Sequence, residues 1–171
     1  MHTAAASDRD LALLRRAIAL AAEARAHGNH PFGALLTDRD GHILAEAENT
    51  VMTEKDVTGH AETNLVRIAS RTLPPDVLAT ATLYTSTEPC AMCAGAIYWL
   101  GIPRVVYGLP ESELAKLTGN DPENPTLALP ARQVLNAGQR AVEVIGPLLV
   151  EEARAVHLGF WQPDRPDRIS P

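Results

Sequence analysis

Apolar residues recur along the chain with two spacings, and each spacing predicts a different kind of element. Leu11, Leu14 and Ile18 follow one another at intervals of three and four residues, which is typical of a helix with one buried face. Short apolar runs on both sides of Asp40-Gly41 predict a β-hairpin. The two patterns predict helices at 8–27, 59–70, 90–100, 113–117, 131–137 and 148–159, and strands at 32–37, 43–47, 81–86, 104–107 and 142–145.

The order of these elements favours an α/β fold. Helices and strands alternate after the hairpin, which is typical of a mixed sheet with helices on both faces. The connection from Tyr107 to Val142 contains a helix and is too long for a hairpin, so the last two of the five strands should run parallel. Residues 50–58 and most of 110–130 are expected to be loop. We expect a single domain over residues 1–171, with an irregular tail at about 162–171.

Composition and charge narrow the function classes. The chain has 171 residues, of which 46% are hydrophobic and 21% charged, as in soluble globular domains. Its net charge of −6, without a Lys/Arg cluster, argues against a general nucleic-acid partner. No apolar run reaches the roughly 18 residues of a membrane span, and charged residues interrupt any signal peptide near the start. We therefore expect a cytoplasmic protein without a structural disulfide.

Two short motifs supply the residue types that carry chemistry. One is the His-Ala-Glu sequence at 60–62, and the other is Cys90-x-x-Cys93, each at the start of an expected helix. One imidazole and two thiolates match a catalytic zinc site, in which a water fills the fourth position. Glu62 lies two residues after His60, beside the metal. A carboxylate there can take a proton from the water and pass it to a leaving group.

Each motif also has a plainer interpretation. A lone Cys-x-x-Cys pair is typical of thioredoxin-like redox sites, and a bare His-Ala-Glu is typical of a solvated helix face. A closed structural zinc site needs four ligands, and the fourth would have to be one of the other histidines, His27, His30, His42 or His157. The occurrence of both motifs at helix starts favours one zinc ion per chain in an open site.

With these motifs the chain resembles the cytidine deaminase-like superfamily of zinc hydrolases, whose signature is H-x-E followed by P-C-x-x-C. The resemblance covers roughly residues 28–108 and includes the Pro-Phe-Gly-Ala sequence at 31–34. It implies a three-layer α/β/α sandwich, usually a homodimer, that releases ammonia from a carbon bearing an exocyclic amine. It assigns His60, Cys90 and Cys93 as zinc ligands and Glu62 as the general acid and base.

The resemblance also implies contacts with the substrate. Asn49 matches the family asparagine that hydrogen-bonds the base, and the backbone N–H groups of Ala61 and Cys90 would face the ring or the attacking water. Ordinary helix-start geometry explains these N–H groups equally well. Phe32 and Trp99 are candidates to stack on a flat ring, although core packing is an alternative for both. Trp161 is a candidate to close the site, or to pack the last helix.

Several branches of the superfamily compete for the substrate. The parallel last strands argue against the small cytidine deaminases. The tRNA adenosine deaminases share Cys-Ala-Gly-Ala at 93–96, but they are usually basic. Guanine deaminases share the sequences at 31–34 and 95–99, and cytosine deaminases share parts of both patterns and, loosely, the stretch at 160–164. We expect a free nucleobase or nucleoside, with a guanine-type aminopurine ahead of a cytosine-type pyrimidine. Carboxylates that could add a second proton shuttle are Glu111, Glu113, Asp121 and Glu123.

The helix at 90–100 points to a partner. Its residues 97–100 are Ile, Tyr, Trp and Leu in a row, which is more apolar surface than one buried stripe needs. We therefore expect a homodimer with this helix near the contact. Two other classes of protein stay open: a binding or sensor domain that has lost turnover, against which Glu62 argues, and an RNA-modifying enzyme whose basic surface comes from a partner.

Overall fold

A single mixed sheet organises the computed structural model, which describes residues 5–162. The strands follow the order β2-β1-β3-β4-β5 across the sheet. β1 pairs antiparallel with β2 and β3, while β4 pairs parallel with β3 and β5. The strands are β1 (Gly33–Thr37), β2 (Ile43–Glu48), β3 (Thr82–Thr87), β4 (Arg104–Leu109) and β5 (Glu143–Ile145). The expected hairpin and the parallel last pair of strands are confirmed.

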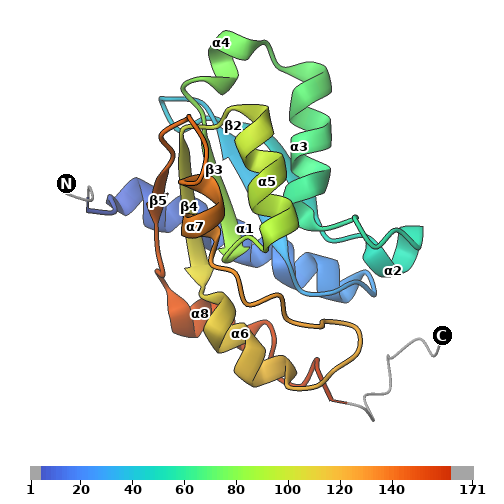
Figure 1. Ribbon diagram of the computed structural model, residues 1–171. Helices are drawn as coiled ribbons and strands as arrows, with labels where there is room; N and C mark the ends of the chain where they lie inside the picture. The colour runs from blue at the N-terminus through green and yellow to red at the C-terminus, as the bar shows by residue number, and fades with distance from the viewer. Residues whose placement is uncertain (1–4, 163–171) are drawn as a thin grey trace.

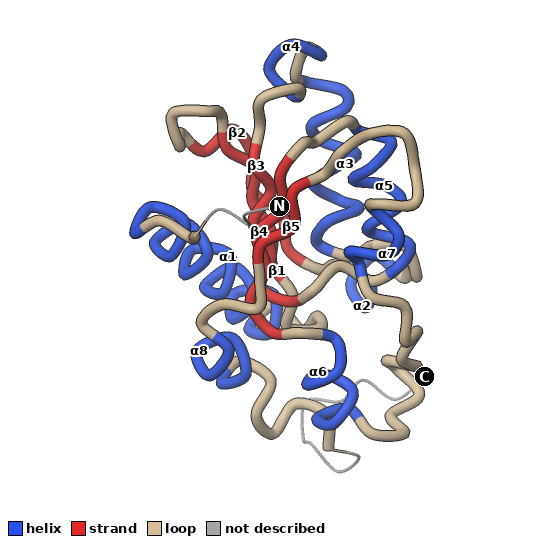
Figure 2. Tube along the Cα trace, turned by 60° about the vertical axis from the view of Figure 1, so that its left-hand side comes forward, coloured by secondary structure: helices blue, strands red, loops and turns tan. Residues whose placement is uncertain are grey.

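Helices cover both faces of the sheet (Figures 1 and 2). One layer holds α1 (Asp8–Ala26) and α8 (Val150–Ala155), and the other holds α3 (Ala61–Thr72), α5 (Ala91–Leu100) and α7 (Ala131–Leu135). The helix α6 (Glu111–Thr118) lies beyond the end of β4, at the bottom of Figure 1. This arrangement confirms the three-layer α/β/α sandwich. Along the described part of the chain, no helix is long and apolar enough to cross a membrane.

Each layer has its own hydrophobic core, and the strand β1 contributes to both. Leu36 packs into the core beneath α3 and α5, whereas Leu35 packs into the core beneath α1. All five residues of β1 are buried, as expected for a strand inside a sheet with both faces covered. Gly33 opens this strand where α1 passes close by, since a Cβ there would stand 2.5 Å from the carbonyl oxygen of Ala17.

A buried charged cluster joins α1 to the sheet. Ser7 and Asp10 form a capping box at the start of α1. The Asp10 carboxylate also accepts hydrogen bonds from the Tyr84 hydroxyl at 2.7 Å and from Arg104 at 2.8 and 3.0 Å. Burial alone would raise the pKa of Asp10, but the hydrogen bonds from Arg104, Ser7 and Tyr84 hold it well below its usual range. This carboxylate therefore stays charged and ties the helix to β3 and β4.

Several boundaries differ from the sequence prediction. The expected loop at 50–58 contains the short helix α2 (Val51–Glu54), and Pro75 opens a further turn, α4 (Pro75–Leu78), because proline suits the first helical position. α6 is longer than expected, and α7 and α8 are shorter. Four-residue helices carry too little periodicity to be recognised from sequence. The tail expected at 162–171 falls outside the described residues except for Gln162.

Candidate active site

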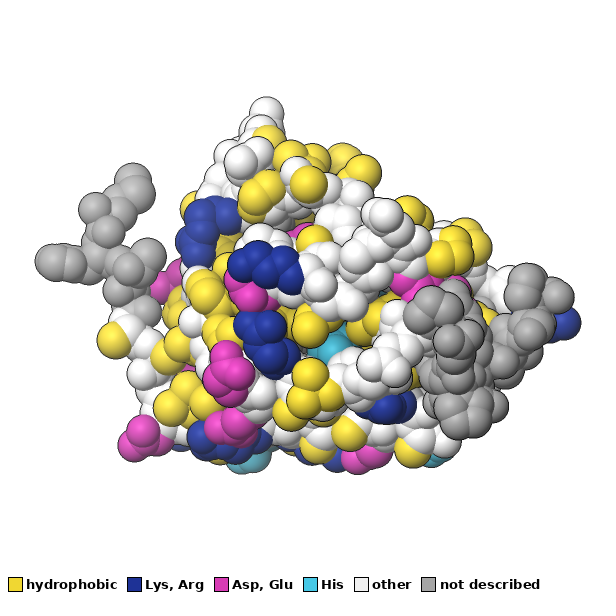
Figure 3. All heavy atoms as spheres, turned by 90° about the horizontal axis from the view of Figure 1, so that it is seen from below, with side chains coloured by type: hydrophobic (Ala, Val, Ile, Leu, Met, Phe, Trp, Pro, Cys, Tyr) yellow, Lys and Arg dark blue, Asp and Glu magenta, His cyan; other side chains and the backbone are white. Residues whose placement is uncertain are grey.

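A cavity of about 400 Å³ opens at the end of the molecule where β3 and β4 finish. Its walls come from the loop before β1, from α2 and the following loop, from the starts of α3 and α5, and from residues 111–127. Figure 3 shows this end from below, with hydrophobic side chains around a histidine. Ligand pockets of roughly 300–1,000 Å³ suit small molecules, so the cavity is of the size for a small organic ring.

His60, Cys90 and Cys93 meet beside this cavity, and His60 and Cys90 form part of its lining. His60 is the N-cap residue of α3, and Cys90 is the N-cap residue of α5, so the two helix starts converge. His60 Nδ1 lies 3.6 Å from Cys90 Sγ and 3.5 Å from Cys93 Sγ. Tetrahedral zinc, with Zn–N near 2.0 Å and Zn–S near 2.3 Å, separates nitrogen and sulfur by about 3.5 Å. The three donor atoms therefore fit a single zinc ion.

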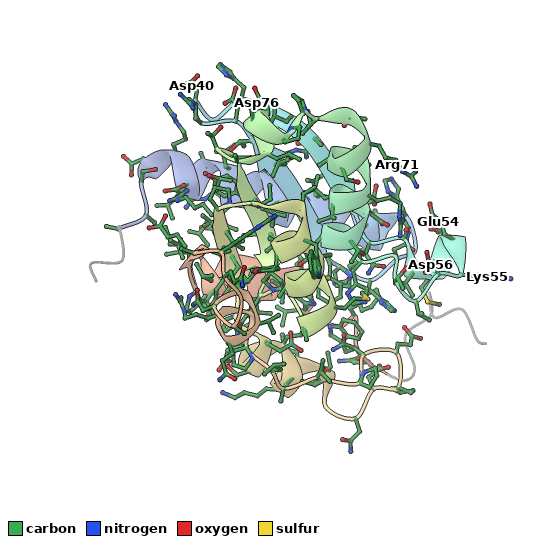
Figure 4. The ribbon with its side chains drawn as sticks, turned by 45° about the horizontal axis from the view of Figure 1, so that its top comes forward. Asp40, Glu54, Lys55, Asp56, Arg71 and Asp76 are labelled. Carbon is green, nitrogen blue, oxygen red and sulfur yellow. The ribbon has the colours of Figure 1, made fainter. Side chains whose placement is uncertain are left out.

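The cluster is open, and no disulfide joins its two cysteines in this structure. Within residues 5–162, no fourth histidine, cysteine or acidic residue belongs to the group. The closed site with a further histidine is therefore not supported, and both cysteines are free thiols. A second group of possible metal ligands lies at the exposed hairpin turn and consists of Asp38, Asp40 and His42. Figure 4 shows Asp40 far from Glu54 of α2. Asp38 accepts the turn's own backbone N–H groups, so this group is part of the turn.

The cluster is electrostatically prepared for a cation. The hydrogen bond from the Cys93 thiol lowers the pKa of Cys90 to about 4, although burial opposes this. The same hydrogen bond, together with burial, raises the pKa of Cys93. The Cys90 thiolate in turn raises the pKa of His60. Without metal the cysteines thus share one proton, which a bound cation displaces.

Glu62 occupies the floor of the cavity beside this cluster. Its side chain is almost completely buried, and the Thr85 hydroxyl lies 2.7 Å from Glu62 Oε1 as its hydrogen-bond donor. Burial and the negative charge of Cys90 raise the pKa of Glu62. Glu62 is outside the group of three donor atoms. Its position therefore suits a group that exchanges protons with a molecule in the cavity.

Of the other predicted contact residues, Phe32 lines the cavity, whereas Asn49, Ala61 and Trp99 are not part of its lining. Asn49 is buried, its Oδ1 accepts from the N–H of Val51, and its Nδ2 has no hydrogen-bond partner among residues 5–162. Ala61 is the first residue of α3, so its N–H belongs to the helix start. Trp99 does not reach the cavity, because its side chain lies on the outer side of α5 with 80% of its surface exposed.

Of the four candidate carboxylates, two line the cavity and two do not. Glu111 and Glu123 line the cavity. Glu113 instead forms ion pairs with Lys116 and Arg154, each at 2.6 Å. Asp121 accepts the N–H of Glu123 within the loop and does not line the cavity. Burial and the charges of Cys90, Glu88 and Glu62 raise the pKa of Glu111 to about 7.

Three further residues of the cavity wall lie outside the candidate contacts predicted from the sequence. His30 Nε2 is 3.1 Å from Glu123 Oε2, across the mouth of the cavity. Thr87 and Glu88 end β3 and lead into the second motif. All three adjoin stretches that the sequence does mark, since His30 precedes Pro31 and Glu88 precedes Pro89. Adjacency to a motif was therefore the available signal.

An aromatic cluster packs behind the cavity and includes Trp161. The Trp161 ring lies 6.1 Å from Phe32 and 5.4 Å from His30, and its Nε1 donates to His157 Nδ1 at 3.1 Å. Trp161 is itself buried and is not part of the lining. In this structure it therefore supports Phe32 and His30 from behind.

Comparisons with known proteins agree with this geometry. Residues 7–109 match the family model of the cytidine and deoxycytidylate deaminase zinc-binding region. A probable cytosine deaminase of Schizosaccharomyces pombe is 44% identical over 165 residues, which are 96% of this chain and 100% of that protein. A guanine deaminase of Bacillus subtilis is 42% identical over 109 residues, 63% of this chain and 69% of that protein. A solved complex with 2,6-diaminopurine superposes with a TM-score of 0.77 at 26% identity, covering 95% of this chain and 86% of the other.

Proposed function

Because the chain belongs to the family of deaminases that carry the cytidine and deoxycytidylate deaminase zinc-binding region, we propose that it hydrolytically removes an exocyclic amino group from a free nucleobase or nucleoside. One observation carries the proposal: a three-donor cluster with zinc geometry opens into a small cavity beside a buried carboxylic acid. In this proposal His60, Cys90 and Cys93 hold the zinc ion, and Glu62 transfers protons.

The roles follow from chemistry and position. Zinc, when bound, supplies Lewis-acid activation of water at neutral pH. Glu62 takes up a proton on the water side and delivers it to the departing nitrogen, which becomes ammonia. Burial raises the pKa of Glu62, which favours the protonated form that donates to the departing nitrogen. Thr85 donates to Oε1, which fixes the orientation of the carboxyl group beside the cluster.

In this proposal the substrate ring is bound by a hydrogen-bond donor, by hydrogen-bond acceptors and by an aromatic face. Asn49 Nδ2 is a buried donor whose partner would be a carbonyl oxygen or an unprotonated ring nitrogen. The carboxyl groups of Glu111 and Glu123 accept from ring N–H groups. Phe32 offers an aromatic face. A small heterocycle that carries both donors and acceptors on its edge meets all of these requirements.

Two rings are candidates. A guanine-type aminopurine is supported by the Pro-Phe-Gly-Ala sequence at 31–34, by the Gly-Ala-Ile-Tyr-Trp sequence at 95–99, and by the likeness to the Bacillus guanine deaminase. A cytosine-type pyrimidine is supported by a different observation. The likeness to the probable cytosine deaminase of S. pombe extends over the whole of that protein, including the part that matches residues beyond 109.

Ammonia release separates these possibilities. The zinc-loaded protein is assayed with guanine, cytosine, 2,6-diaminopurine, cytidine and tRNA anticodon stem-loops that contain adenosine. Glu62→Gln is the control. Turnover of a free base or nucleoside that Glu62→Gln abolishes supports the proposal. Turnover of the tRNA substrate alone would instead make the protein an RNA-modifying enzyme. Zinc binding without any turnover would favour a binding or sensor domain.

We further propose that the protein is a homodimer with α5 near the contact. Trp99 and Met92 on α5, and Ile68 on the adjacent α3, are exposed large hydrophobic residues on one helical layer. Light scattering should give about twice the 18.4 kDa of one chain at micromolar concentration. Trp99→Lys should shift the population toward the monomer. A stable monomer of the parent protein would refute this proposal.

A further inference from the structure

The Glu88 carboxylate joins two helix starts that are far apart in the sequence. Glu88 Oε2 accepts the backbone N–H of Glu111 at 3.1 Å, and Oε1 accepts the backbone N–H of Ala131 at 3.0 Å. The backbone N–H of Glu88 donates to the carbonyl oxygen of Leu109 at 2.8 Å. One side chain therefore holds the first residue of α6 and the first residue of α7.

Neither helix has a cap of its own. The N-cap residues are Pro110 and Pro130, which have no side-chain oxygen, and neither start shows a side-chain cap. A helix start leaves backbone N–H groups without intrahelical partners. A carboxylate suits them, because it is negative and has two acceptor oxygens. Glu88 therefore supplies from outside what both prolines lack.

The segment between these two attachments forms much of the cavity wall. Its lining residues run from Glu111 to Leu127 and include both inward-facing carboxyl groups, Glu111 and Glu123. The side chain of Glu123 reaches across to His30 at 3.1 Å. Glu88 itself stands two residues before Cys90 in the motif that supplies two of the zinc ligands. It thus lies close in sequence to the metal cluster and is the hydrogen-bond partner of the opposite wall.

We propose that Glu88 is a positioning residue that sets the distance between the zinc cluster and the substrate-binding wall at 111–127. This inference rests on the proposed function, in which a nucleobase lies between the two. Glu88 acts through Glu111 and the wall, and it transfers no proton. Loosening either attachment lets the wall move away from the ring, so binding of the base suffers more than the chemical step.

The test is Glu88→Gln, which keeps the size of the side chain but leaves one acceptor oxygen for two N–H groups. Hydrogen exchange followed by mass spectrometry measures how firmly the wall is held, without any substrate. We expect peptides that cover 110–118 and 130–135 to exchange about tenfold faster or more, while peptides of α3 do not change. In steady-state kinetics on the best base, KM should rise about tenfold, which corresponds to ~1.4 kcal/mol, with a smaller change in kcat and full zinc content.

The matched control is Glu151→Gln on α8, where the carboxylate is 85% exposed and is not part of the cavity lining. It should leave exchange, KM and zinc content unchanged. Unchanged exchange at 110–118 and 130–135 in Glu88→Gln would overturn the proposal, and so would unchanged KM or a loss of zinc. If the parent protein deaminates no base, the proposed function fails, and the exchange experiment still decides whether Glu88 holds the wall.

Discussion

The buried imidazole of His157 makes the stability of the fold depend on pH in a way that can be calculated. Trp161 Nε1 donates to His157 Nδ1, so the neutral ring carries its proton on Nε2, which has no hydrogen-bond partner within residues 5–162. Burial, and next the positive charge of Arg25, lower the pKa of His157 to about 3. In the unfolded chain the value is about 6.5. At pH values between these two pKa values, His157 binds a proton in the unfolded state but not in the folded state.

The sign and the size follow from linkage. Stability contributed by the neutral ring is complete above pH 6.5 and decreases as pH falls through the window from 6.5 to 3. The slope approaches about 1.4 kcal/mol per pH unit, so His157 alone should remove about 2 kcal/mol between pH 7 and pH 5. His157→Asn keeps an acceptor for Trp161 and does not titrate. It should be less stable at pH 7 because it leaves a small cavity, but it should lose about 2 kcal/mol less than the parent between the two pH values.

Urea unfolding at pH 7 and pH 5 measures the free energy of unfolding of the parent protein and of His157→Asn, and so gives both the loss at pH 7 and the difference in pH dependence. Contributions from zinc and from other titrating groups are common to the two proteins and cancel in the comparison. An unchanged pH dependence in His157→Asn would refute the reasoning that His157 is held neutral by burial.

Three further predictions concern the site and the fold. Glu62→Gln should lower kcat by about 10²–10⁴-fold or more while keeping zinc, and loss of zinc from this variant would mean that Glu62 is a ligand. Cys93→Ser, or treatment with a chelator, should remove zinc and activity together, as metal analysis and ammonia release will show; activity that persists without zinc would contradict the assignment. Tyr84→Phe removes the 2.7 Å hydrogen bond to the charged Asp10 and should cost about 1.5–3 kcal/mol in unfolding free energy, with no change in KM.

The sequence predicted the fold and the metal cluster well, because both depend on local patterns. Helical periodicity marked α1, the Asp40-Gly41 turn marked the hairpin, and ligand spacing marked the cluster. The sequence did not separate Glu111 and Glu123, which face the cavity, from the other two acids of the same segment. That choice depends on how a long crossover packs beyond the end of β4, which no local pattern records. Likewise, the row of four apolar residues on α5 predicted apolar surface beyond one buried stripe but did not reveal that Trp99 is the residue that faces solvent.

The groups that would perform the reaction and the two acids that would accept from the ring, Glu111 and Glu123, occupy separate stretches of the chain. His60, Glu62, Cys90 and Cys93 all precede the end of β4 at Leu109, whereas the wall belongs to the crossover between β4 and β5. Connections tolerate changes in sequence and length better than the strands they join. Natural divergence can therefore redirect the choice of base by rewriting one contiguous segment while the chemistry is inherited intact. The same division makes residues 110–130 the natural unit to exchange between relatives when a new specificity is wanted.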